Sequence, residues 1–188
     1  NGHGTHVAGT IAAVGNNELG TTGVSWNSRV MAVKFLDEDN SGFIGDAIKA
    51  INYVTMMHTD FGVNVRIANN SWATTSLDLT LQAAISAAGE AGILVVAGAG
   101  NGTIFRQPVD LDAAGQAVYP AAFPLDNVMS VTATDRNDAL VPTFNFGVTS
   151  VDLAAPGVDI YSTETGDSSG GDYSFRTGTS MAAPHVSR

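Results

Sequence analysis

The chain has 188 residues, which is enough for one domain with a hydrophobic core. Apolar residues make up 44% and charged residues 14%, a balance that is typical of globular proteins and excludes a disordered chain. The net charge of −10 disfavours nucleic acid and anionic membranes as partners, and the absence of Cys excludes disulfides and thiolate metal sites. No apolar run has the length of a transmembrane helix.

Strands and helices are predicted to alternate along the chain. Short apolar runs predict five strands, at 29–36, 63–71, 93–97, 128–133 and 150–154. Apolar residues at helical spacing predict helices at 43–58 and 77–91, and Gly92 is expected to end the second of them.

This alternation predicts one domain over residues 1–188 with a three-layer α/β fold, in which a mostly parallel twisted sheet carries helices on both faces. Sheets of this kind bind their ligands at the carboxyl ends of the strands. The segments that directly follow the strands are therefore expected to hold the functional residues.

The first motif is Asn-Gly-His-Gly-Thr-His at residues 1–6, followed by small residues that predict a closely packed helix with His3 at its mouth. A His in this place can act as a general base if a hydroxyl nucleophile lies within about 3 Å of its ring. A purely structural His is the alternative. His6 could suggest a metal pair with His3, but no Glu or third ligand completes the HExxH pattern, which disfavours a zinc site.

The last motif, Gly-Thr-Ser-Met-Ala-Ala-Pro at 178–184, places Ser180 at the start of a predicted helix, with Pro184 tolerated in its first turn. A helix start presents free backbone N–H groups and partial positive charge, which suits a serine whose substrate develops an oxyanion. An N-cap serine without catalytic function is the alternative.

The middle motif is a strand that runs into Gly98, Gly100 and Asn101. Glycines allow a substrate backbone to come close, and the Asn amide can donate a hydrogen bond to an oxyanion. A dinucleotide-binding loop is the competing interpretation. It is disfavoured because the pattern is GxGxG rather than GxGxxG and because Pro108 stands where a helix should begin.

Together, in this order and spacing, the three motifs resemble the subtilisin-like serine peptidases, the subtilase family, over nearly the whole chain. The resemblance implies that His3 is the catalytic base, that Ser180 is the nucleophile and that Asn101 donates to the oxyanion together with the backbone N–H of Ser180. The implied reaction is hydrolysis of peptide bonds through an acyl-enzyme, with no cofactor for the chemistry.

The resemblance also implies a substrate site for polypeptides, which the family binds as an extended strand between two of its own segments. The matching positions in this chain are Asn40, Ser41, Gly42, Ser71, Trp72 and Ala73, with Gly98 and Gly100 lining the first specificity pocket. Trp72 is larger than the residue that many members have there, and a buried core aromatic is its alternative role.

Two structural features follow from the same resemblance. The loop 15–23 resembles a calcium-binding loop of the family, in which Asn17 would be the side-chain ligand of a structural calcium; a plain Gly/Asn turn is the alternative. Tyr119 and Pro120 resemble the family's cis-proline turn beside the substrate pocket.

The triad Asp precedes the His in this family, but only Asn1 and Gly2 precede His3 here. We therefore expect a partial catalytic domain that starts at the His motif, ends just after the Ser motif and is inactive by itself. By resemblance we expect the parent protein to be secreted and monomeric, with a signal peptide and a propeptide that binds it.

Two other functions compete with a subtilase peptidase. The sequence Gly-Thr-Ser-Met-Ala at 178–182 is one residue from the GxSxG motif of esterases, but Ala182 replaces the last Gly and the base precedes the nucleophile, which is the wrong order for that fold. A non-catalytic family member that serves as a binding module is the other alternative, against which the intact His3, Asn101 and Ser180 argue.

Overall fold

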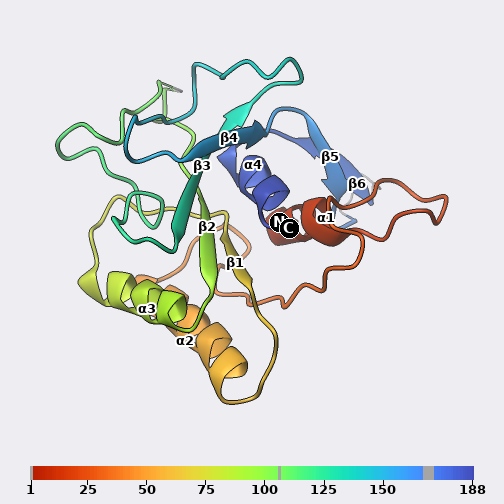
Figure 1. The fold of residues 1–188 in the computed structure, drawn as a ribbon. Coiled ribbons are helices and arrows are strands. Elements are labelled where there is room, and N and C mark those ends of the chain that lie inside the picture. Colours follow the sequence, from red (N-terminus) through yellow and green to blue (C-terminus); the bar gives the residue numbers. More distant parts are fainter. Residues whose placement is uncertain (1, 106, 167–171) are drawn as a thin grey trace.

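The computed structural model describes residues 2–105, 107–166 and 172–188. Its centre is an all-parallel sheet whose strands follow one another in chain order, β1-β2-β3-β4 (Figure 1). The strands are β1 (Ile67–Asn70), β2 (Leu94–Gly98), β3 (Val128–Thr134) and β4 (Leu153–Pro156). Four of the five predicted strands are therefore confirmed, with ends shifted by a few residues.

Two helices cover one face of the sheet, α2 (Ile44–Thr59) and α3 (Leu79–Glu90), as predicted. Their facing sides share an apolar core with β2, in which Leu81, Ile85 and Val95 are fully buried. Asp78 begins α3 by accepting hydrogen bonds from two free backbone N–H groups of the first turn. Gly92 follows the helix with φ +82°, which confirms its predicted role as the stop.

The opposite face of the sheet carries α4 (Thr179–Val186). This helix begins within the motif at 178–184 that contains Ser180. Ala182 and Ala183 have no exposed surface and pack against Val96 and Val131 of β2 and β3. Small side chains allow this short helix to lie close to the sheet. Helices on both faces of a parallel sheet confirm the predicted three-layer α/β fold.

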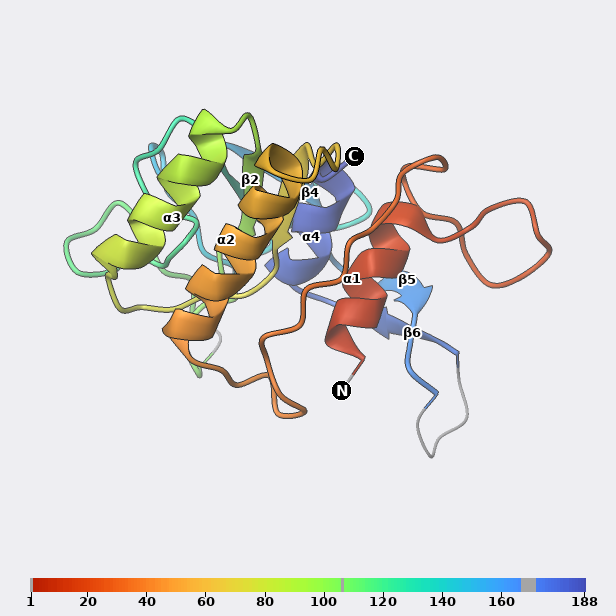
Figure 2. The ribbon, with the colours of Figure 1, turned by 90° about the horizontal axis from the view of Figure 1, so that it is seen from below.

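A third group of elements stands beside these layers. The helix α1 (His3–Ala12) packs on α4 and on a hairpin of two antiparallel strands, β5 (Ile160–Thr163) and β6 (Tyr173–Arg176) (Figure 2). This hairpin was not predicted from the sequence. None of the helices within the described residues is long and apolar enough to cross a bilayer.

The strand predicted at 29–36 is wrong for this structure. No strand is assigned in this described segment, and Val30 is 45% exposed. An apolar run forms a strand only where a neighbouring strand completes its hydrogen bonds, and none of the sheet's pairings involves these residues.

Candidate active site

His3 is the first residue of α1, as the sequence predicted, and it is half-buried. It follows Gly2, whose backbone has the left-handed conformation with φ +71° and ψ −7°. Burial lowers the pKa of the His3 imidazole below its usual 6.5, and the positive charges of Arg176 and His6 lower it further, while Glu164 acts in the opposite direction. The ring is therefore neutral at pH 7, the state that a general base requires.

The ring of His3 borders a cleft of about 400 Å³. Three of its walls come from segments far apart in the sequence: the start of α1, the turn before α2 and the segment after β1. They include six residues that were predicted to bind substrate, namely Asn40, Ser41, Gly42, Ser71, Trp72 and Ala73. The structure thus brings the predicted base and both predicted substrate segments to one cleft.

Ser180 lies in the first turn of α4, next to this cleft. Its hydroxyl donates a hydrogen bond to the carbonyl of Ser71 over 3.3 Å, and the hydroxyl of Ser71 donates to the carbonyl of Ser180 over 2.9 Å. Since Ser71 lines the cleft beside His3, this reciprocal pair places Ser180 at the edge of the cleft.

Pro184 explains why the carbonyl of Ser180 is free to accept this bond. The proline is the sixth residue of α4, beyond the first turn in which it was expected. It has no backbone N–H, so it leaves the carbonyl four residues earlier without its helical donor. That carbonyl belongs to Ser180, and the hydroxyl of Ser71 takes the place of the missing donor.

α1 and α4 lie side by side, and their amino-terminal ends are on the same side of the pair (Figure 2). His3 is the first residue of α1 and Ser180 the second of α4. Two chain segments at opposite ends of the sequence thus bring the predicted base and the predicted nucleophile to one region.

Asn101 follows β2 at the carboxyl edge of the sheet, where functional residues were expected. Its side-chain Oδ1 accepts hydrogen bonds from the backbone N–H of Thr179 over 2.8 Å and from the Thr179 hydroxyl over 3.1 Å. The backbone N–H can only donate, so the oxygen of the amide must face Thr179. The Nδ2 group is then left as a hydrogen-bond donor. The Asn101 side chain is exposed and is fixed through its bonds to Thr179, the residue that precedes Ser180.

Gly98 and Gly100 hold the same junction from the strand side. A Cβ on Gly98 would lie 3.1 Å from the carbonyl oxygen of Thr179, and the N–H of Gly100 donates to the Thr179 hydroxyl over 3.0 Å. The absence of a side chain at Gly98 therefore lets the start of α4 pack on the end of β2, and the backbone of Gly100 bonds the same helix start. Neither is among the described residues that line the cleft around His3, and their part in a specificity pocket stays a prediction.

Trp72 combines the two roles weighed for it. It lines the cleft, and its indole N–H donates to Oδ1 of Asn70 over 2.8 Å. Its ring meets Phe35 edge to face with centroids 5.2 Å apart. The aromatic is thus a rigid wall of the cleft that also packs, half-buried, against the apolar core of α2, α3 and β2.

The predicted calcium loop supplies few ligands. Oδ1 of Asn17 already accepts a hydrogen bond from the N–H of Leu19. Among the described residues, no group of three His, Asp or Glu side chains could hold a metal ion. The described side chains therefore fit a calcium ion poorly, and calcium at Asn17 stays a prediction. The cis peptide bond expected between Tyr119 and Pro120 is present.

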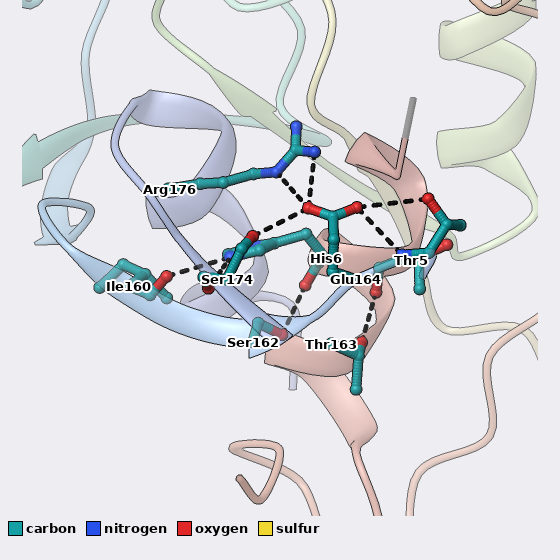
Figure 3. A network of polar contacts seen from close by, with 9 residues as sticks. Thr5, His6, Ile160, Ser162, Thr163, Glu164, Ser174 and Arg176 are labelled. Carbon is teal, nitrogen blue, oxygen red and sulfur yellow. Dashed lines mark hydrogen bonds and ion pairs between the residues drawn. The ribbon is translucent and has the colours of Figure 1, made fainter. Parts of the chain in front are cut away.

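Sequence reasoning missed two charged residues near His3. Glu164 directly follows β5 and Arg176 ends β6, and they form an ion pair beside α1 (Figure 3). Since the hairpin itself was not predicted, no sequence signal placed these residues together.

The family of this chain follows from its similarity to known proteins. A family model described as "Subtilase family" matches residues 1–188. This chain belongs to the subtilase family. As a subtilase, it is 40% identical over 186 residues to a thermophilic serine proteinase from Bacillus sp. (strain AK1), with 99% of this chain and 41% of the relative covered. It is 38% identical over 187 residues to Subtilisin Savinase from Lederbergia lenta, with 99% and 60% covered.

A solved structure agrees with the fold of this subtilase. The crystal structure of a cold adapted subtilisin-like serine proteinase superposes with a TM-score of 0.77 at 31% identity, covering 100% of this chain and 59% of the other. The chain spans about 40 to 60% of the length of these relatives.

Proposed function

We propose that the intact protein is a serine endopeptidase of the subtilase family, in which this chain supplies the base, the nucleophile and the oxyanion donor. The observation that carries the proposal is the shared cleft. His3 and both predicted substrate segments line it, and Ser180 is hydrogen-bonded to one of its walls.

In the first step, the neutral ring of His3 takes the proton of the Ser180 hydroxyl while the oxygen attacks the scissile carbonyl. The protonated ring then gives this proton to the leaving amine, which departs and leaves an acyl-enzyme on Ser180. In the second half, His3 removes a proton from water, the hydroxide attacks the ester, and Ser180 recovers its proton. The hydrogen bond from the Ser180 hydroxyl to the Ser71 carbonyl must break in the first step. At 3.3 Å this hydrogen bond is long and therefore weak.

The negative charge that develops on the carbonyl oxygen needs fixed donors. Nδ2 of Asn101 and the backbone N–H of Ser180 are proposed for this role. The hydrogen bonds between Asn101 and Thr179 support it, because they fix the amide next to the nucleophile before substrate binds.

The substrate class proposed is polypeptide in extended conformation. Residues 40–42 and 71–73 lie on two walls of the cleft, and each of them is exposed or half-buried. A strand between these walls is proposed to form main-chain hydrogen bonds with them. No residue of 1–188 is proposed as the triad Asp, since no Asp precedes His3. An extracellular location, a propeptide partner and a monomeric state are further proposals that rest on the family alone.

The test is active-site labelling of the intact protein with a fluorophosphonate, followed by mass spectrometry of the modified residue. We expect the label on Ser180, none in Ser180→Ala, weak labelling in His3→Ala and full labelling in the control Ser28→Ala, which removes an exposed hydroxyl. Hydrolysis of a peptide amide, compared with that of a nitrophenyl ester, separates a peptidase from an esterase.

Absence of labelling in a folded wild-type protein would reject the proposal in favour of a non-catalytic binding module. Hydrolysis of the ester without hydrolysis of the peptide would favour the esterase.

A further inference from the structure

The ion pair of Glu164 and Arg176 has more hydrogen bonds and is more buried than an ordinary surface ion pair. The Arg176 guanidinium donates two hydrogen bonds to Oε2 of Glu164, over 2.8 Å from Nε and 2.6 Å from Nη2. The Ser174 hydroxyl donates to the same oxygen over 2.8 Å, and the N–H of Thr165 donates to Oε1 over 3.0 Å. The Glu164 side chain is only 11% exposed. So many donors fix the carboxylate in one position.

This carboxylate lies directly against the residue that precedes the proposed base. A Cβ placed on Gly2 would lie 1.3 Å from Oε1 of Glu164. The oxygen thus occupies the space that any side chain at position 2 would need. It also stands at the amino-terminal end of α1, where free N–H groups carry partial positive charge that a carboxylate stabilises.

The rest of the hairpin holds the first turns of α1 by side-chain hydrogen bonds. The Ser162 hydroxyl donates to the carbonyl of His6 and the Thr163 hydroxyl to the carbonyl of Thr5, both over 2.8 Å. Nε2 of His6 lies 3.0 Å from the carbonyl of Ile160 and 3.2 Å from that of Ser174. Two strands and one helix are thereby joined around the backbone that carries His3.

Three titratable or charged groups act on His3: His6 from α1, Arg176 from β6 and Glu164, which follows β5; none of them comes from α4, which also packs on α1. Burial alone would raise the pKa of Glu164, but the hydrogen bonds from Arg176 and Ser174 outweigh it and lower that pKa. Glu164 is therefore a permanent negative charge at neutral pH. It opposes the positive charge of Arg176, which disfavours a protonated His3.

We propose that Glu164 is a positioning residue for the base: its carboxylate, held by Arg176 and Ser174, fixes the start of α1 and supplies the negative charge that stabilises the imidazolium formed during the reaction. The inference rests on the proposed function, since it assigns a role relative to His3 as the base.

The test compares Glu164→Gln and Arg176→Gln with the double variant in the intact protein. For Glu164→Gln we expect kcat on a peptide substrate to fall about tenfold with KM within about twofold, because the loss falls on the proton transfer rather than on substrate binding. The acid limb of the pH profile of kcat/KM should move to lower pH in Glu164→Gln, to higher pH in Arg176→Gln and lie between them in the double variant.

A matched control is Glu90→Gln, which neutralises an exposed carboxylate at the end of α3 and should change none of these quantities. An acid limb that stays in place in Glu164→Gln, whether or not kcat and the melting temperature fall, would overturn the proposal, because a merely structural residue would behave in this way.

A second measurement does not depend on activity. Titration of the His3 ring by NMR should show a lower pKa in Glu164→Gln than in the wild type and a higher one in Arg176→Gln. If the wild type fails to label at Ser180 while these pKa differences are present, the proposed function fails but the effect of Glu164 on His3 stands. Equal His3 pKa values in wild type and Glu164→Gln overturn the inference even if the enzyme is active.

Discussion

The sheet with α2 and α3 and the joint between α1 and the β5–β6 hairpin are held together in opposite ways. In the first, apolar side chains such as Ile85 and Val95 are fully buried. In the second, the fully buried side chains are His6 and Ser162, and hydrogen bonds connect the elements. Apolar packing is non-directional, whereas hydrogen bonds fix angles as well as distances. The difference indicates that the first region supplies stability and that the second fixes the position of His3.

The comparison predicts the largest loss of stability for a truncation in the apolar region. Ile85→Ala should lower the free energy of unfolding by about 2–5 kcal/mol, because it removes buried methyl groups and leaves a cavity. Urea denaturation in a Ser180→Ala background, which prevents self-cleavage, measures it. Leu79→Ala in the same helix is the control, since Leu79 is 70% exposed and should cost about 0.5 kcal/mol or less. Equal losses would contradict the assignment of stability to the core.

A smaller loss of stability is expected for a change in the polar joint, which is the contact between α1 and the β5–β6 hairpin. His6→Ala leaves the carbonyls of Ile160 and Ser174 without this donor, and we expect about 1–3 kcal/mol. Hydrogen exchange should become faster in α1, β5 and β6 and stay unchanged in β1–β3. His58→Ala, which removes a single bond to the carbonyl of Val63 at the end of α2, is the matched control. Faster exchange throughout the sheet would show that the two regions do not separate.

Loss of the N-terminal cap of α3 should lower the free energy of unfolding by less than Ile85→Ala or His6→Ala. Asp78→Ala removes the acceptor of two first-turn N–H groups and should cost about 1 kcal/mol. Asp78→Ser keeps a capping oxygen and should recover most of this. Thermal unfolding of the three proteins checks the order, and an Asp78→Ser variant no more stable than Asp78→Ala would reject the capping role.

The smallest effect is the dependence of stability on pH. Burial lowers the folded-state pKa of His6 and of His185 below 6.5, although backbone hydrogen bonds partly oppose this. The unfolded chain then binds more protons than the folded one just below pH 6.5. Stability should thus be complete above about pH 6.5 and decrease as the pH falls towards the folded pKa values. Urea midpoints between pH 8 and 5 measure the slope, which should be reduced but still present in His6→Gln because His185 remains; an unchanged slope would contradict this.

The same division explains what the sequence could predict. The apolar periodicity of residues 44–54 and 81–88 predicted α2 and α3, and the continuous apolar run before Gly98 predicted β2, because burial selects residue types over many positions. The resemblance to subtilases predicted part of the lining of the cleft, namely His3 and the segments 40–42 and 71–73, but not its apolar residues such as Phe35 and Phe43.

The polar joint could not be predicted in this way. β5 and β6 are short, and Tyr161 and Phe175 on their outer side are exposed, so no apolar pattern marks them. The partners of His6 lie 154 and 168 residues away in the chain. The segment 29–36 shows the converse error, since an apolar run is not sufficient for a strand without a neighbour.

The contact between Gly2 and Glu164 has a consequence for variation in relatives and in designed variants. Because Oε1 of Glu164 occupies the position of a side chain at residue 2, these two sites compete for one volume. A larger residue at position 2 is compatible with the fold only if residue 164 becomes shorter at the same time. A shorter residue 164 should therefore reduce the loss caused by a larger residue 2 without abolishing it, because the left-handed backbone of Gly2, with φ +71°, strains any side chain there.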